Sequence, residues 1–527
     1  MSSDKFYITT PIYYVNARPH IGHTYTTVAA DALARFQKLT GARVFFATGT
    51  DEHGAKIAQK AKSENKEPLE FVQEISEQFK KAWSDMNIEY DRFIRTTEKD
   101  HIKAVQNALQ FMKDKGDIYK DKYEGLYCVG CEQFKNEKDL VGGKCPDHQT
   151  VPEFMSEETY VFKMSKYADR LLKIIESDEL KISPEERKNE ILSFYKKEGL
   201  KDVSFSRKNI KWGIPLPWDE AHTAYVWSDA FLNYLTVLGW DGNPANRPEM
   251  WPPALQLMSK DILRVHATIW PAMLLSLEMP LPREIFVHGF FLVDGQKMSK
   301  SIGNVIAPED LIARYGADAT RYLLLSAAVY GYDGDISWKK FDEKYTADLA
   351  NGLGNLVART IGMTEKYFDG KVPANTQSGG PVLIKAVSAG VMGKPNSGSV
   401  RSYFTFSLSY YSQFMDAFDL YGVIQDISRR INTLDGYISD YQPFKLIKED
   451  KEKTAAVLYN CLEGIRIISV LLYPFMPSTA EEIMRRLGLE PEMELKKGFN
   501  KLTEWGGLQP GAKVNKGEPL FPRLNQD

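Results

Sequence analysis

The first fifty residues contain a predicted strand, a helix and a second strand, and this unit restricts the fold more than any other part of the sequence. Residues 6–10 and 43–48 are strand-like, and residues 29–39 place apolar side chains at helical spacing before Gly41. A crossover helix makes the two strands that it connects parallel, and parallel sheets are covered by helices. We therefore expect an α/β domain that binds its ligands at the carboxyl ends of the strands.

A polar cluster follows each of these two strands. The tetrapeptide His20-Ile21-Gly22-His23 opens the predicted helix, and Thr50-Asp51-Glu52-His53-Gly54 follows the second strand. A helix N-terminus favours phosphate, and a glycine there lets a nucleotide approach closely. The tetrapeptide alone is weak evidence, since single histidines are more often structural.

A second basic string lies in the loop between a strand-like segment, residues 285–293, and a helix that should begin near Pro308. Lys297-Met298-Ser299-Lys300-Ser301 carries two ammonium groups among small residues. A solvated basic loop is the ordinary alternative. Both strings occur in this order with a long segment between them, so a shared role in binding phosphate is favoured over coincidence.

Three of the four cysteines are clustered and suggest a metal site. Cys128, Cys131, Cys145 and His148 follow the pattern Cys-x2-Cys, thirteen residues, Cys-x2-His. Tetrahedral Zn²⁺ takes four nitrogen or sulfur ligands from two such knuckles, and four protein ligands make the ion structural. Reduced thiols without metal are the alternative. Cys461, on an apolar helical face, should be a small buried side chain.

Composition narrows the class of protein further. The chain has 527 residues, and 43% of them are hydrophobic, so global disorder is excluded. Its net charge of −3 gives no indication of nucleic-acid binding. We see no uninterrupted apolar segment of the roughly 18 residues that a membrane span needs. No amphipathic or apolar leader precedes the first strand, so we expect a cytoplasmic protein without a membrane segment.

The last third of the chain has helical periodicity. Leu349, Leu353, Leu356 and Thr360 share one face of a predicted helix, and strand signals are few beyond residue 340. Between Asp369 and Asp416 there is no acidic residue, and several glycines interrupt the segment. We interpret residues 370–415 as a loop-like insertion without an assigned function.

Together the two basic strings resemble the signatures of class I aminoacyl-tRNA synthetases. Residues 10–16, 50–54, 225–230, 260–266 and 270–272 narrow the resemblance to the methionyl-tRNA synthetase family. The resemblance implies a Rossmann-type catalytic domain in two halves, residues 1–118 and 205–335, the second of which includes the stem-contact region. It also implies a zinc-bearing connective insertion, residues 119–204, and an α-helical anticodon-binding bundle, residues 336–527.

The same resemblance implies attachment of L-methionine to tRNA(Met) through a methionyl-adenylate, with Mg²⁺ accompanying ATP. It assigns catalysis to His20, His23, Lys297 and Lys300, and ATP binding to Gly22, His20, His23 and Lys300. Asp51 would meet the α-ammonium group, and the methionine pocket would consist of Ile12, Tyr14, Trp227, Ala230, Tyr234, Ile262 and His266. Anticodon recognition would fall to Asn355, Arg359 and Phe444, of which Phe444 replaces a tryptophan of many bacterial relatives. Phe231 also departs from some relatives, which have proline there.

Two other functions remain as alternatives. One is another adenylyl-transferring enzyme of the same fold, for a different amino acid or a small acid. The other is a non-catalytic, zinc-containing RNA-binding module. Two intact phosphate motifs disfavour the module, and the long helical region disfavours a small-acid enzyme. The chain leaves no room for the editing insertion of Leu, Ile or Val enzymes, and we see no dimerising barrel at its end, so we expect a monomer.

Overall fold

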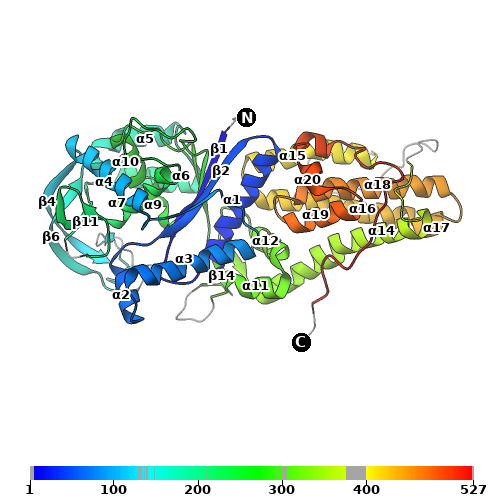
Figure 1. Cartoon of the computed structure of the whole chain (residues 1–527), viewed down its shortest axis with the longest axis horizontal. Coiled ribbons are helices and arrows are strands. Elements are labelled where there is room, and N and C mark those ends of the chain that lie inside the picture. Colours follow the sequence, from blue (N-terminus) through cyan, green and yellow to red (C-terminus); the bar gives the residue numbers. More distant parts are fainter. Residues whose placement is uncertain are drawn as a thin grey trace.

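The computed structural model describes residues 5–128, 133–135, 137, 140–146, 149–208, 210–293, 295–298, 305–374 and 399–524. The chain forms an elongated molecule with an α/β part at one end and a helical part at the other (Figure 1). Helix α1, Ile21–Leu39, lies between the two parts and contributes to both. The predicted parallel-sheet domain and the predicted helical domain are both confirmed.

Six parallel strands form the central sheet, in the order β3-β2-β1-β12-β13-β7. Strands β1, Lys5–Tyr14, and β2, Arg43–Asp51, are joined by α1 as the periodicity predicts. The other strands are β3, Arg92–Arg95, β12, Leu255–Ser259, β13, Glu284–His288, and β7, Lys181–Ser183. The carboxyl ends of β1 and β2 therefore lie together, where ligands bind in such sheets.

Two edge strands are not visible in the sequence pattern. The pattern of residues 60–118 predicts helices, and most of this range is in α2, Ala55–Ser63, α3, Pro68–Asp85, and α4, Lys99–Asp114. Strand β3 lies between α3 and α4 and was not expected. Strand β7 belongs to residues 119–204, the predicted insertion, together with α5, Ala168–Glu176, and α6, Glu185–Lys197. Strands of three or four residues are too short to show a period, and their pairing partners are distant in sequence.

The expected strand over residues 285–293 is in fact two strands in different sheets. Strand β13 ends at His288, and β14, Phe291–Val293, pairs with β15, Gln296–Lys297, and β16, Gly334–Ile336. A Cβ atom at Gly289 would lie 2.2 Å from the carbonyl carbon of Tyr332. This close approach of two backbones requires glycine and explains where the strand breaks.

The segment between the two halves of the central sheet forms small antiparallel sheets. Strands β5, Gln133–Lys135, β4, Ile118–Cys128, β6, Glu153–Phe162, and β8, Val203–Ser204, are neighbours in that order. A second sheet contains β10, Pro215–Leu216, β11, Asp219–Ala224, and β9, Ser206–Arg207. Strands β4 and β6 lie at the far end of the α/β part from the helical domain (Figure 1).

The helical domain packs around α18, Lys451–Leu472. It also contains α14, Asn355–Phe368, α15, Val400–Asp416, α16, Leu420–Tyr441, α17, Pro443–Leu446, and α19, Pro477–Arg486. By length and apolar composition α18 could cross a bilayer, but 94% of its most apolar window is buried inside the protein. A central core helix meets the same criterion, so this helix is accounted for by packing.

Part of the acid-free segment is helical, which corrects our reading of residues 370–415 as loop-like. Helix α15 begins after Ser399, whose hydroxyl accepts a hydrogen bond from the Ser402 amide. Val400, Phe404 and Tyr411 are fully buried at helical spacing. The glycine-rich part, residues 375–398, lies outside the described residues. Composition concealed the helix because several of its exposed positions, among them Ser402, Thr405 and Ser409, carry uncharged side chains.

Helix α1 is tied to the helical domain by a buried ion-pair network. Arg321 of α12, Ala317–Ser326, lies 2.6 Å from the Asp31 carboxylate and donates to the carbonyl oxygens of Pro474 and Phe475 at 2.9 and 2.8 Å. Arg35 also pairs with Asp31, at 2.8 Å. The helix that carries the first basic string at its N-terminus is therefore fixed to the α18–α19 turn.

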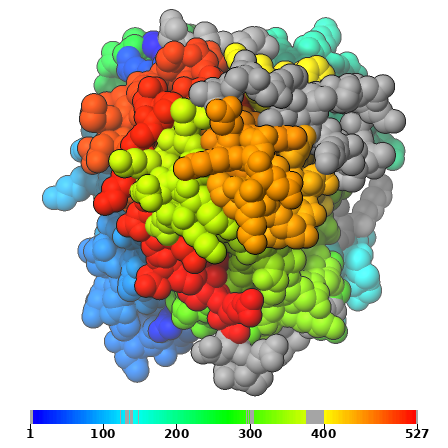
Figure 2. All heavy atoms as spheres, turned by 90° about the vertical axis from the view of Figure 1, so that its right-hand side faces the viewer, coloured from blue at the N-terminus to red at the C-terminus, as the bar shows by residue number. Residues whose placement is uncertain are grey.

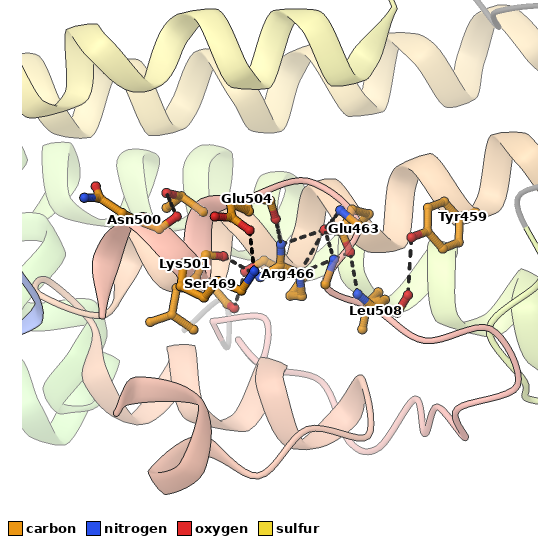
Figure 3. Close-up of polar contacts among 12 residues, drawn as sticks. Tyr459, Glu463, Arg466, Ser469, Asn500, Lys501, Glu504 and Leu508 are labelled. Atoms are coloured by element: carbon orange, nitrogen blue, oxygen red, sulfur yellow. Dashed lines mark hydrogen bonds and ion pairs between the residues drawn. The ribbon is translucent and has the colours of Figure 1, made fainter. Parts of the chain in front are cut away.

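The end of the helical domain is visible as one continuous face in Figure 2. Parts of α14 (yellow-green), of α16 to α18 (orange) and of the C-terminal segment (red) lie side by side on it. The C-terminal segment is held to α18 by the buried pair Glu463 and Arg466 (Figure 3). Glu463 accepts hydrogen bonds from the amides of Gly506, Gly507 and Leu508 at 2.7 to 2.9 Å.

Candidate functional site

The N-terminus of α1 carries two histidines whose rings face each other. His20 is the N-cap residue and its Nδ1 accepts a hydrogen bond from the Gly22 amide at 3.1 Å. His23 Nδ1 accepts from the His20 amide at 3.3 Å, and the two ring centroids are 3.8 Å apart. A Cβ atom at position 22 would lie 2.9 Å from His20 Cε1, so the folded-back imidazole requires glycine there.

These hydrogen bonds fix which nitrogen of each ring carries the proton. Because Nδ1 is the acceptor in both residues, a neutral imidazole at either position has its N–H at Nε2. Burial, with a smaller contribution from the charge of His20, holds the pKa of His23 well below its ordinary value. His23 is therefore a neutral Nε2–H donor at neutral pH. The site combines this donor with the positive end of a helix dipole.

Residues before and after the second basic string contact α1, although residues 299–304 lie outside the described residues. The Ile21 amide donates to the Ile306 carbonyl at 3.3 Å, and Thr26 Oγ1 lies 2.6 Å from His288 Nε2 at the end of β13. The backbone of Lys297 is in β15, paired with Leu292. The Lys297 side chain and all of Lys300 lie outside the described residues, so their predicted roles stay predictions.

The predicted methionine residues gather near the carboxyl ends of β1 and β2. Tyr14 and Asp51 are register partners at those ends. Ala230 and Tyr234 are buried, on α7, Val226–Ala230, and α8, Asn233–Thr236. Ile12, Tyr14, Trp227 and Ile262 are half-buried. Side chains that are only partly buried near the carboxyl end of a strand can form the wall of a ligand site.

His266 is held in one orientation within this group. Its Nδ1–H donates to the Ile262 carbonyl at 2.9 Å, so its Nε2 accepts from the Tyr234 hydroxyl, also at 2.9 Å. Burial lowers the pKa of His266 to about 4, so the ring is neutral at physiological pH. Phe231, the position that departs from some relatives, packs edge-on against His266 at 4.9 Å and stacks on Trp270. It is part of the aromatic wall.

Three buried residues that we did not select from the sequence lie beside this wall. Asp229 Oδ2 is 2.7 Å from His53 Nδ1, and Asp229 Oδ1 is 2.8 Å from His101 Nε2. His53 and Asp229 stand in two segments, residues 50–54 and 225–230, that carried the family resemblance. The contact itself was invisible, because the partners are 176 and 128 residues apart.

Two of the four predicted zinc ligands are described and both are buried. Cys128 ends β4, and Cys145 follows a tight turn through Gly142 and Gly143. Both contact Thr150: the Cys145 amide donates to its carbonyl at 2.8 Å, and Cys128 Sγ lies 4.0 Å from its hydroxyl. This arrangement fits a thiolate metal site. Cys131 and His148 lie outside the described residues, and the described part of the chain contains no complete set of metal ligands.

The predicted anticodon residues lie on the helical domain, and α17, which carries Phe444, is at the far end of that domain from α7 and α1 (Figure 1). Asn355 is exposed and begins α14 directly after a π-helical segment, Tyr345–Gly354. Arg359 forms an ion pair with Asp435 at 2.8 Å. Phe444 is 44% exposed, although it is a large apolar side chain. Exposed aromatic rings of this kind can stack on nucleic-acid bases.

Two family descriptions match nearly the whole chain. One, "tRNA synthetases class I (M)", matches residues 6–151 and 147–361, and the other, "Anticodon binding domain of methionyl tRNA ligase", matches residues 388–527. The methionine–tRNA ligase of Clostridium acetobutylicum is 45% identical over 99% of this chain and 79% of that protein. That of Streptomyces coelicolor is 40% identical over 99% of this chain and 97% of its own length.

One solved structure of similar fold is a complex with methionyl-adenylate. Mycobacterium tuberculosis methionyl-tRNA synthetase in complex with methionyl-adenylate aligns with a TM-score of 0.88 and 36% identity, covering 98% of this chain and 99% of that one. A parallel sheet with paired histidines at a helix N-cap and a following helical domain defines a class I aminoacyl-tRNA synthetase. The chain belongs to the methionyl-tRNA synthetase family, which attaches methionine to tRNA(Met) in an ATP-dependent reaction.

Proposed function

We propose that this chain activates L-methionine with ATP at the N-terminus of α1 and transfers it to tRNA(Met). The observation that carries the proposal is the pair of stacked imidazoles, His20 and His23, at the start of a helix whose Ile21 amide donates to the Ile306 carbonyl. A buried aromatic group around His266 lies at the ends of the same strands. Adenylation of an apolar amino acid requires phosphate donors and an apolar pocket close together, and both lie at the carboxyl ends of the strands here.

The chemistry needs no protein nucleophile. The methionine carboxylate attacks the α-phosphorus of ATP, the bond to the bridging oxygen breaks, and pyrophosphate leaves. Negative charge builds on the α-phosphate, where His20, His23, Lys297 and Lys300 would stabilise it and Mg²⁺ bound to ATP would neutralise part of it. The terminal ribose hydroxyl of tRNA then attacks the adenylate carbonyl and releases AMP. The reaction is accelerated by positioning the substrates and by stabilising the charge that develops on the phosphate.

Methionine recognition would divide between one carboxylate and an aromatic wall. Asp51, at the end of β2, would pair with the α-ammonium group. The side chain would lie against Trp227, with Ile12, Tyr14, Ala230, Tyr234, Ile262 and His266 as its other neighbours. A thioether accepts hydrogen bonds only weakly and makes favourable contacts with rings, so such a pocket suits its sulfur.

We further propose that Cys128, Cys131, Cys145 and His148 bind one structural Zn²⁺ in a connective insertion over residues 119–204. The purified protein should contain one zinc ion per chain. Cys128→Ser should release it and destabilise the insertion, because metal binding and folding are coupled at such sites. Elemental analysis measures the metal, and Cys461→Ala, at a buried cysteine of α18, should retain it. Zinc-free wild-type protein, prepared without chelators, would remove the proposal.

The helical domain, residues 336–527, would read the anticodon with Asn355, Arg359 and Phe444. Stacking of a base on an aromatic ring contributes roughly 1–3 kcal/mol by alanine substitution. Phe444→Ala should therefore lower the efficiency of aminoacylation about 5- to 150-fold through weaker tRNA binding. Methionine-dependent ATP–pyrophosphate exchange should be unchanged, because the ring is remote from α1.

This pair of assays tests the proposed function as a whole. The matched control is Phe406→Ala, which removes another exposed phenylalanine of the helical domain, 52% exposed, and should leave both activities intact. Equal losses in exchange and charging for Phe444→Ala would mean that the ring stabilises the fold. Full charging would mean that the anticodon is read by other residues.

Each proposed site is built from residues of a single chain, and we therefore propose a monomer. The apolar helix α18 is enclosed by its own domain, which supports a protein without a membrane segment. The family's work in translation supports a cytoplasmic location. The two catalytic halves would be residues 1–118 and 205–335.

A further inference from the structure

Asp229 joins four elements through two buried histidines. It lies on α7, accepts from His53 in the loop after β2, and accepts from His101 on α4. His101 Nδ1 in turn lies 2.7 Å from Thr236 Oγ1 on α8. Asp229 and His101 are at most 1% exposed, and His53 is 6% exposed. No step of the adenylation chemistry above uses these side chains.

The hydrogen bonds require Asp229 to be ionised. Burial alone would raise the pKa of this carboxyl, but the charge of His53 and the hydrogen bonds from both histidines outweigh burial, and the pKa is lowered. Each carboxylate oxygen then accepts one ring N–H, from His53 Nδ1 and from His101 Nε2. An amide in place of the carboxylate could accept from only one of them.

Of the four elements that Asp229 joins, all but α4 carry or adjoin a residue of the proposed methionine site. Asp51 ends β2 two residues before His53, α7 carries Trp227 and Ala230, and α8 carries Tyr234. The loop is itself buried from Asp51 to Gly54, and beside it His53, Gly54 and Trp212 line a small cavity of about 20 Å³. The polar side chains of a buried loop need hydrogen-bond partners within the protein, and a charged partner such as Asp229 holds His53 in one direction.

A second anchor holds the same loop on its other side. The Glu52 carboxylate is buried and pairs with Arg95 at 2.7 Å, and its backbone amide donates to Thr96 at 2.9 Å. Glu52 thus fixes the loop to β3, whereas His53 and Asp229 fix it to α7. The Asp229 contact is the one of these two anchors that links the loop directly to α7, the helix of Trp227.

We propose that Asp229, His53 and His101 form a positioning network that sets the distance between the ammonium-binding and side-chain-binding parts of the methionine site. Their effect falls on the amino acid and not on ATP, whose proposed donors are His20 and His23 at the start of α1 and the lysines Lys297 and Lys300. The inference rests on the proposed function, because it takes Asp51 and Trp227 as methionine-binding residues. None of the three residues needs to touch the substrate.

Asp229→Asn tests the proposal with little change in volume. We expect the KM for methionine in ATP–pyrophosphate exchange to rise roughly 10- to 100-fold, the range for losing a hydrogen bond to a buried charged group. The KM for ATP should stay within about threefold of the wild-type value, because the substitution does not alter the residues that are proposed to bind ATP. An unchanged KM for methionine, or equal rises for both substrates, would overturn the proposal.

A matched pair at position 101 keeps the test independent of whether Asp229→Asn folds well. The side-chain amide nitrogen of His101→Gln can replace Nε2 and donate to Asp229, whereas that of His101→Asn replaces Nδ1 and cannot. We expect the glutamine variant to keep a near wild-type KM for methionine and the asparagine variant to raise it about tenfold or more. The same KM in both variants would contradict a role for the Asp229–His101 hydrogen bond. Wild-type protein without methionine-dependent exchange would instead refute the proposed function.

Discussion

His20→Ala is expected to lower the rate of methionine-dependent ATP–pyrophosphate exchange by roughly 10²–10³, with little change in ATP affinity. Loss of one preorganised donor to developing charge typically costs about 2.7–4 kcal/mol of transition-state stabilisation. His20 Nδ1 accepts from the Gly22 amide, so the proton of a neutral ring is on Nε2, the atom that would donate to the phosphate. Lys300→Ala should reduce the exchange rate to a similar extent, because its ammonium group would stabilise the same charge.

His20 also caps α1, so a variant that keeps the cap separates the two roles. Asparagine is a favourable N-cap residue whose side-chain oxygen can accept from the Gly22 amide. His20→Asn should therefore keep the wild-type melting temperature and still lose exchange activity. Lys339→Ala, at a lysine that is 85% exposed, is the control for Lys300→Ala and should be silent. Exchange rates within a few-fold of wild type for both active-site variants would contradict the assignment.

Glu463→Gln should produce the largest loss of stability in the helical domain. The carboxylate is fully buried, lies 2.6 Å from the Arg466 guanidinium and accepts three backbone amides (Figure 3). Removing one partner of such a pair leaves the other charge buried and uncompensated, which typically costs about 3–5 kcal/mol. We expect a lower thermal midpoint and faster hydrogen exchange at the amides of residues 506–508.

The control for this prediction is a glutamate that forms a surface ion pair. Glu481 pairs with Arg485 at 2.8 Å, and the arginine is 53% exposed. Exposed pairs of this kind contribute about 0–1 kcal/mol, so Glu481→Gln should change the midpoint little. If Glu463→Gln and Glu481→Gln gave equal midpoints, the C-terminal segment would not depend on the buried pair. Local hydrogen exchange is preferred to one global unfolding free energy, because a chain with several domains need not unfold in two states.

Local features of the site could be predicted from the sequence, and long-range features could not. Strands β1 and β2, helix α1 and the His20–Gly22–His23 group lie within fifty residues, where periodicity and glycine placement determine the structure. Strand β7 joins the sheet beside β13, about a hundred residues further along the chain, and three residues carry no period. Helix α15 is hidden for a different reason, since uncharged residues such as Ser402, Thr405 and Ser409 occupy exposed positions where charged residues usually mark a solvent-facing side.

The Asp229 network shows the same limit within the site. Residues 50–54 and 225–230 could each be recognised as segments typical of the family, but nothing in either one indicates that His53 and Asp229 meet. His101 lies on an amphipathic helix in which a buried histidine looks like any other core position. A contact between side chains far apart in sequence is fixed by the packing of α4 and α7 onto the sheet, which single-sequence patterns do not contain.

The central claim is that the chain forms methionyl-adenylate at the α1 end of the sheet. The most direct measurement is ATP–pyrophosphate exchange with the wild-type protein and each of the twenty standard amino acids in turn. We predict rapid exchange with methionine and at most slow exchange with the others, without any need for tRNA. Exchange supported best by a different amino acid, or by none of the twenty, would contradict the account.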